Sequence, residues 1–229
     1  MKKSILFLFS LIAGIALFSG TLMAGGPKNF EGIITFKISY PGNKLNESQE
    51  AMLPKMLTVS IKDTKSKTEI KTQMGDQVEI TDYKDKSKVT LMDIMGQKYA
   101  IKMTNEQIEK ENAKEPAATV TLSNETKVVA GYTCKKAIVA VNDDGVKSTY
   151  DVYYTNELGT KATNFDNPMY KDIDGVMLEF SMKNPQFTME FTATSVEKKS
   201  ISPKEFEIPA EYKVVTKEEL QSKFGGMGQ

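Results

Sequence analysis

The chain alternates apolar and polar residues at every second position over most of its length. In FEGIITFKISY, residues 30–40, the side chains of Ile34, Phe36, Ile38 and Tyr40 fall on one face of an extended chain, and the polar residues between them fall on the other. A period of two is typical of a half-buried β-strand, because successive side chains of a strand point to opposite faces. The alternation therefore predicts a mainly β protein.

The same alternation recurs along the rest of the sequence. It is present in MLTVSIKD, KTEIKT, QVEIT, KVTLMD, KYAIKM, ATVTLS, KAIVAV, STYDVYYT, VMLEFSM and QFTMEFTATSV. Short connections rich in turn residues, such as Asn142–Gly145 and Asn184–Pro185, separate these segments. We therefore predict a curved, mostly antiparallel sheet of about 10–11 strands that forms a half-open barrel, apolar inside and polar outside. Two sheets packed face to face are the alternative.

Three segments interrupt the strand pattern and predict short helices that cover the sheet. They are NKLNESQEAMLPKM, TNEQIEKENAK and KEELQSKF. Asn46 or Ser48 is placed to cap the first helix. Thr104 and Gln107 have the spacing of a capping box at the start of the second. The first segment also carries apolar residues on one side, which is typical of an amphipathic lid.

The N-terminus has the features of a secretory signal peptide. Lys2 and Lys3 precede an apolar run that extends from Ile5 to Phe18, which is short for a membrane span of about 20 residues. We expect cleavage after Ala24 and a periplasmic or secreted protein with no transmembrane anchor. An uncleaved helical anchor is the alternative. The expected organisation is a signal peptide over 1–24, one β domain over 25–220 and a flexible tail over 221–229.

The composition excludes several classes of chemistry. The sequence contains no histidine, so Ser-His-Asp and Cys-His catalysis and histidine-containing metal sites are impossible. All of its basic residues are lysines, and the formal net charge is zero, which argues against a nucleic-acid partner. We expect no enzymatic activity, no cofactor and no metal ion. A pair of carboxylates, as in glycosidases, is the one catalytic device that this composition leaves open.

Cys134 is the single cysteine of a chain that we expect to be exported. A thiol without a partner in its own chain is buried, paired with another molecule or reactive. Lys135 and Lys136 would lower the pKa of an exposed thiol. Cys134 nevertheless begins a strand whose other members pack apolar side chains, and free cysteine behaves as a small buried hydrophobe. Burial of Cys134 is therefore the favoured expectation, with an intermolecular disulfide as the alternative.

Three motifs resemble an uncharacterised exported family, domain of unknown function 4412, within or near the LolA/LolB-like superfamily of periplasmic lipoprotein carriers. They are GYTCKKA at 131–137, DVYYTNELG at 151–159 and FEIPAEYK at 206–213. The resemblance implies a concave sheet covered by helices, with an apolar cavity able to hold acyl chains. The carrier governs its closed state with an arginine, which this sequence lacks. The resemblance therefore does not extend to a carrier cycle.

Alternation and resemblance together predict a non-enzymatic binding module that holds an apolar ligand, such as a lipid or a lipoprotein acyl chain, in the half-barrel. The alternative is a structural or stress-related envelope protein with a filled core that acts through contacts with another envelope protein. Apolar residues of the strands and of the first helical segment are the expected cavity lining. They are Phe36, Ile38, Leu53, Met56, Leu91, Ile101, Phe180 and Phe191.

Overall fold

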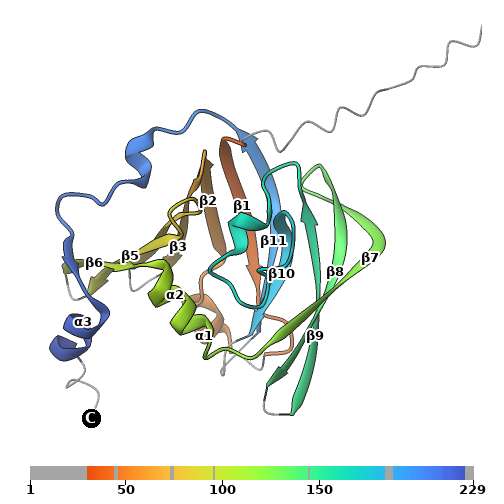
Figure 1. Cartoon of the computed structure of the whole chain (residues 1–229), viewed down its shortest axis with the longest axis horizontal. Coiled ribbons are helices and arrows are strands. Elements are labelled where there is room, and N and C mark those ends of the chain that lie inside the picture. Colours follow the sequence, from red (N-terminus) through yellow and green to blue (C-terminus); the bar gives the residue numbers. More distant parts are fainter. Residues whose placement is uncertain are drawn as a thin grey trace, which may run out of the picture.

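A computed structural model describes residues 30–224, except 44–45, 73–74, 95, 144 and 184–187. The chain forms one curved sheet of twelve strands that does not close into a barrel, with a few short helices (Figure 1). This confirms the predicted fold class. The expected signal peptide and the last five residues of the expected tail lie outside the described residues. No helix among the described ranges is long and apolar enough to cross a membrane.

The strands are β1 (Gly32–Ser39), β2 (Met56–Lys62), β3 (Lys65–Thr72), β4 (Gly75–Asp82), β5 (Ser87–Ile94), β6 (Gln97–Met103), β7 (Ala118–Val129), β8 (Tyr132–Asp143), β9 (Val146–Thr155), β10 (Val176–Lys183), β11 (Thr188–Lys198) and β12 (Lys213–Val215). The α-helices are α1 (Glu47–Met52), α2 (Asn105–Asn112) and α3 (Lys217–Phe224). Two 3-10 turns, η1 (Lys161–Asn164) and η2 (Pro203–Phe206), interrupt long connections.

The sheet consists of two meanders, β1–β6 and β7–β11, which meet at its centre because β1 pairs with β11. Its order is β12-β6-β5-β4-β3-β2-β1-β11-β10-β9-β8-β7. All neighbours are antiparallel except β12, which runs parallel to β6. Each of the eleven segments with the alternating pattern forms a strand in the structure, and β12 is the one strand that was not predicted. Three residues cannot display a period of two, which is why alternation missed it.

Capping side chains start the helices where the sequence predicts. Asn46 accepts a hydrogen bond from the backbone N–H of Gln49 at 2.9 Å, and the Gln49 side chain accepts one from the backbone of Asn46. Thr104 and Gln107 form the same reciprocal pair at the start of α2. These bonds satisfy N–H groups that have no partner inside a helix. Both predicted caps are thereby confirmed, with Asn46 rather than Ser48 at the first helix.

The concave face of the sheet is apolar at its centre. Ile34, Phe36 and Ile38 of β1 point to this face and are at most 4% exposed. They pack in one cluster with side chains from the neighbouring strands, including Leu57, Ile61, Leu178, Phe191 and Ala193. The alternation in β1 therefore does bury one complete face of the strand.

The connection between β9 and β10, which we call the plug segment (residues 156–175), lies inside the curve of the sheet (Figure 1). Tyr170 and Ile173 of this segment are at most 1% exposed and pack on Val139 and Val152 of β8 and β9. The ring of Tyr170 meets the ring of Phe180 edge to face at 6.0 Å. The chain thus fills much of its own apolar interior.

The convex face of β4–β6 is also apolar, and the chain covers it. The connection from β11 to β12, which we call the outer strap (residues 199–212), runs around the outside of these strands (Figure 1). Its side chains Ile201 and Phe206 pack on Val78, Ile80 and Leu91. Residues on both faces of β4–β6 are therefore used in packing, one face by the barrel interior and the other by the strap.

Candidate functional site: the rim beside helix α1

Helix α1 ends where the sequence requires it to end. Pro54 disfavours helical geometry at the residue before it, and Leu53 accordingly has extended backbone angles of φ −82° and ψ 146°. The chain turns there and enters β2 at Met56. A short helix, a proline turn and the start of a strand are thus brought together at the rim of the sheet.

Two hydrogen bonds fix this turn to β1. The hydroxyl of Tyr40 donates to the carbonyl of Pro54 at 2.7 Å, and the backbone N–H of Ile38 donates to the carbonyl of Lys55 at 2.9 Å. Burial raises the pKa of Tyr40, so its hydroxyl keeps the proton that it donates. The backbone of the rim is therefore held rigidly although its side chains point outward.

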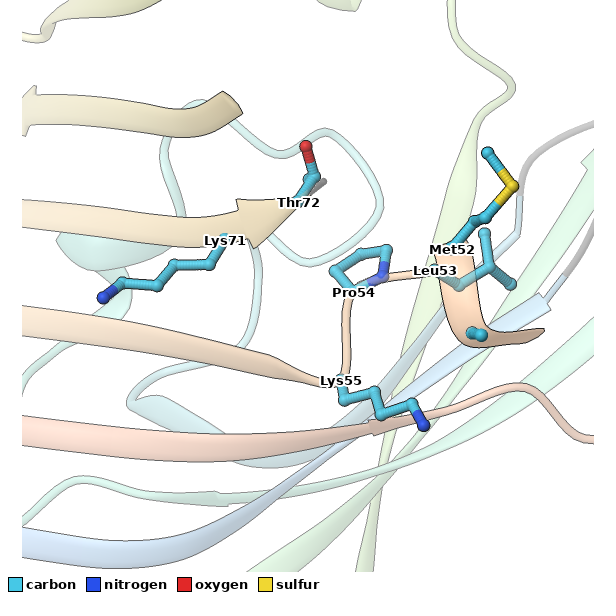
Figure 2. A pocket seen from close by; sticks show the side chains of 7 residues that line it. Met52, Leu53, Pro54, Lys55, Lys71 and Thr72 are labelled. Carbon is cyan, nitrogen blue, oxygen red and sulfur yellow. The ribbon is translucent and has the colours of Figure 1, made fainter. Parts of the chain in front are cut away.

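A hollow of about 250 Å³ lies at this turn (Figure 2). Two of its walls are apolar, from helix α1 and from the Leu53–Pro54 turn, and the end of β3 closes a third. The lining residues are Ala51, Met52, Leu53, Pro54, Lys55, Lys71 and Thr72. Met52 is 58% exposed, and Met56, which follows the lining residue Lys55 in the chain, is 57% exposed. Large apolar side chains left in water in this way mark an interaction surface when they are grouped.

Two lysines frame the apolar wall. In Figure 2 the side chain of Lys55 extends on the side of the helix, whereas that of Lys71 extends along its strand away from the helix. Both are exposed, and neither forms an ion pair with another residue of the described ranges. Their ammonium groups are free to meet an anion. We name the surface formed by Met52, Leu53, Lys55, Met56 and Lys71 the rim site.

The size of the hollow limits what it can hold. Pockets that enclose a small molecule are typically about 300–1,000 Å³, so this one accommodates the end of an apolar chain rather than a whole ligand. Methionine is flexible and polarizable, which suits a surface that adapts to its occupant. The rim site can therefore hold an apolar group beside an anionic one.

The structure distributes the eight predicted lining residues over four places. Phe36, Ile38 and Phe191 are buried in the central cluster, and Phe180 packs against it. Leu53 and Met56 lie at the rim. Of the eight, Met56 is exposed and Leu53 lines the hollow, whereas Phe180 is half-buried against the central cluster.

The last two predicted lining residues lie on opposite faces of the sheet. Leu91 pairs with Ala100, whereas Ile101 pairs with Thr90, so the two side chains point away from each other. Leu91 packs under the outer strap, and Ile101 packs with Tyr99 and Val215 on the other face. Leu91 cannot line a concave cavity together with Ile101. Both positions are apolar and in strands, and alternation cannot assign a face where both faces are covered.

A charged cluster on the concave face was not predicted from the sequence. Lys88 of β5 lies 3.2 Å from Glu79 of β4 and 3.4 Å from Asp166 of the plug segment. Burial, followed by the nearby charge of Asp166, raises the pKa of Glu79 although Lys88 lowers it. The alternating pattern places Glu79 and Lys88 at polar positions that were expected to face solvent. The cluster attaches the plug segment to the opposite wall of the sheet.

Cys134 is fully buried, as the sequence predicts. Its thiol lies in the central cluster and is 3.6 Å from the carbonyl oxygen of Tyr132, to which it donates. Burial raises the pKa of this thiol to about 11, so the nucleophilic thiolate is scarce at neutral pH. Lys135 and Lys136 were expected to lower this pKa only if the thiol were exposed, and the buried thiol does not meet that condition.

Comparison with known proteins identifies a family. Residues 43–223 match the family described as "N-glycanase peptide, N-terminal domain". Among solved structures, the crystal structure of a beta-barrel-like protein of domain of unknown function 1849 from Brucella abortus is 6% identical and aligns over 76% of this chain and 99% of that chain, with a TM-score of 0.38. No curated protein matches the sequence.

Proposed function

The chain belongs to the N-glycanase N-terminal domain family, and from that premise we propose that it is an exported, non-enzymatic binding module whose ligand attaches at the rim site. The ligand we propose has an acyl chain and an anionic head group. The observation that carries the proposal is the hollow that brings Leu53 and exposed Met52 together with Lys55, a lysine that has no ion-pair partner among the described residues.

Burial of the acyl chain would supply most of the binding energy. Apolar surface removed from water contributes roughly 25 cal/mol per Å², so about 150 Å² of buried chain contributes several kcal/mol before ordering costs. Because the rim backbone is held by Tyr40 and Ile38, only the side chains would lose conformational freedom. A contact between the head group and Lys55 would add about 1 kcal/mol, the upper range for exposed ion pairs.

The remaining parts of the proposal rest on the sequence. The absence of histidine supports a role without catalysis, and the basic and apolar N-terminal run supports export to a periplasmic or secreted location. The finer relationship to domain of unknown function 4412 and to the LolA/LolB-like superfamily also stays a proposal, supported by the motifs at 131–137, 151–159 and 206–213. A curved, unclosed sheet is compatible with it.

Titration with a fluorescent fatty acid tests the proposal, with its methyl ester as the uncharged probe. We expect the purified protein to bind both and Leu53→Gln to weaken both, because that change removes apolar contact. Lys55→Gln should weaken the acid by about fivefold and leave the ester unchanged, because only the acid carries a charge. Lys102→Gln is the matched control, since Lys102 is exposed on β6, away from the rim site.

Absence of binding by either probe would overturn the proposal, as would equal binding by the wild type and Leu53→Gln. Native mass spectrometry of gently purified protein gives an independent readout, because a retained lipid adds a discrete mass. Circular dichroism of each variant verifies that a loss of binding is not a loss of folding.

A second candidate function is favoured by the filled interior. Tyr170, Phe180 and Phe191 occupy the region where the half-barrel would otherwise hold a ligand. A solid core is what a structural envelope protein that acts through protein contacts requires. In that case the rim site would bind an apolar segment of another envelope protein. The experiment would then show no fatty-acid binding, and the purified protein would instead capture one defined protein. Leu53→Gln would abolish that capture.

A further inference from the structure

Strand β7 forms one of the two edges of the sheet and is long. It runs for twelve residues and pairs with β8 on one side. Among the described residues, no strand pairs with its other side. An edge of this length presents a row of backbone N–H and C=O groups that can pair with another chain. The opposite edge, β12, has three residues.

The apolar core continues to the β7 edge without a boundary. Ala118, Val120 and Leu122 of β7 pair with Val141, Val139 and Ala137 of β8, so all six side chains share one face. Ala118 and Val120 pack against the cluster that contains Val139 and Tyr170. Leu122, last in this row, is 65% exposed. The apolar face of the sheet therefore ends at β7 with a large apolar side chain exposed to solvent. Such a side chain is typical of a strand inside a wider sheet rather than of an edge strand.

Protective features are confined to the other half of the strand. A bulge interrupts the pairing between Leu122 and Thr126, and both charged residues of the strand, Glu125 and Lys127, lie within it or beyond it. Bulges and charges are the usual means of blunting an edge. Residues 118–122, ATVTL, have neither, and they contain three β-branched residues.

We propose that this edge binds a second copy of the chain, with residues 118–122 of the two copies pairing antiparallel about a two-fold axis at Val120. Val120 then faces Val120 of the second copy, Thr119 faces Thr121, and Ala118 faces Leu122. The two sheets join into one continuous sheet, and Leu122 of each copy packs on the small side chain of Ala118.

A second copy is the occupant that the sequence of the edge suits best. The stretch is self-complementary: the small residue at one end meets the large residue at the other, and hydroxyl faces hydroxyl between them. No charge lies within it, so no like charges oppose each other across the axis. A two-fold, isologous contact closes after two copies, which is the commonest form of homo-oligomer.

Disulfide trapping tests both the pairing and its register. Paired antiparallel residues have Cα atoms about 4.5–5.5 Å apart, within the range that a disulfide spans. A mixture of Thr119→Cys and Thr121→Cys should cross-link into a dimer under oxidised glutathione, whereas either variant alone should cross-link several-fold less. Cys134 is buried and does not compete. Five paired residues make a small contact, so trapping is a more sensitive readout than chromatography.

Sedimentation of the uncrosslinked protein provides the second readout. Wild type should show a concentration-dependent dimer that Thr121→Lys abolishes, because an edge lysine opposes pairing. Ala140→Lys is the matched control, since Ala140 is exposed on the adjacent interior strand β8 and should leave the dimer intact. A monomer at every concentration, equal trapping of the mixed and single variants, or a dimer unaffected by Thr121→Lys would overturn the proposal, whatever the rim site binds.

Discussion

The rings of Phe180 and Phe191 lie nearly parallel, 9° apart, with their centroids separated by 4.8 Å. The two residues are directly paired across β10 and β11, so the register of these strands creates the stack. Phe180 also meets Phe36 edge to face at 6.0 Å, which extends the contact to β1. This aromatic group connects the central strands to the plug segment.

Truncation of the stack should be costly. Phe191 is 2% exposed, and we expect Phe191→Ala to lower the free energy of unfolding by about 3–5 kcal/mol through lost burial and a cavity. Urea unfolding measures the change in the free energy of unfolding. The slope of this free energy against urea concentration should stay the same if the denatured state is unaffected. Phe180→Leu keeps most of the apolar volume and should cost about 1–2 kcal/mol. A loss below about 1 kcal/mol for Phe191→Ala would show that the stack is not part of the packed core.

The plug segment should loosen when its ion pair is removed. Asp166 and Lys88 are both largely buried, with side chains 17% and 20% exposed, and Asp166→Asn leaves Lys88 with Glu79 alone. We expect a loss of about 1–2 kcal/mol, between the values for exposed and buried pairs. Limited proteolysis should then cut within residues 156–175 at a higher rate.

A second carboxylate of the same segment provides the control for the plug experiment. Glu157 is exposed and has no ion-pair partner among the described residues, so Glu157→Gln should leave the cleavage rate unchanged. Equal cleavage of wild type and Asp166→Asn would mean that Tyr170 and Ile173, rather than the ion pair, hold the segment in place.

The strands were predictable because alternation records burial of one face. In β1 the three residues expected to point inward do so. The capping-box spacing of Thr104 and Gln107 locates the start of α2, and the start of α1 was predicted to within two residues, at Asn46 or Ser48. Such signals are local, because they depend on residues two to four positions apart. Local signals are what a single sequence contains most plainly.

The content of the half-barrel could not be predicted in the same way. Whether Phe180 faces a cavity or Tyr170 depends on where a loop of irregular sequence folds back, and no periodicity describes that loop. Leu91 shows the same limit on the convex face, where the distant strap covers a side that was expected to be solvated. At the rim site, Leu53 and Met56 were predicted, whereas the lysines beside them required the strand ends to be brought together.

Cys134 should react slowly in the native protein. Its thiol is fully buried and its pKa is raised to about 11, so only about one thiol in a thousand is ionised at pH 8 even if reagent reaches it. We expect labelling by a maleimide to be at least about a hundredfold slower than in urea, limited by opening of the fold. Non-reducing electrophoresis should show no disulfide-linked dimer of the wild type. Prompt, complete labelling of native protein would contradict burial.

The contact between helix α3 and helix α2 should weaken in acid. Glu111 accepts hydrogen bonds from Lys114 at 2.9 Å and from Lys217, the first residue of α3, at 3.0 Å. These bonds lower the pKa of Glu111 from 4.5 to about 2. Because the folded pKa lies below the unfolded one, the stabilisation is complete above about pH 4.5 and is lost as the pH falls toward 2.

Hydrogen exchange of the α3 amides over this pH range, corrected for intrinsic rates, measures the effect. Protection should fall as the pH falls in the wild type. Glu111→Gln, which cannot ionise, should have lower protection than the wild type above about pH 4.5, and the two should converge as the pH approaches 2. The contribution is small because the Glu111 side chain is 39% exposed, and added salt should reduce it further. Glu106→Gln, a change at an exposed carboxylate of α2 without an ion pair among the described residues, is the control. Equal pH dependence in wild type and Glu111→Gln would show that the Lys217 contact does not hold α3.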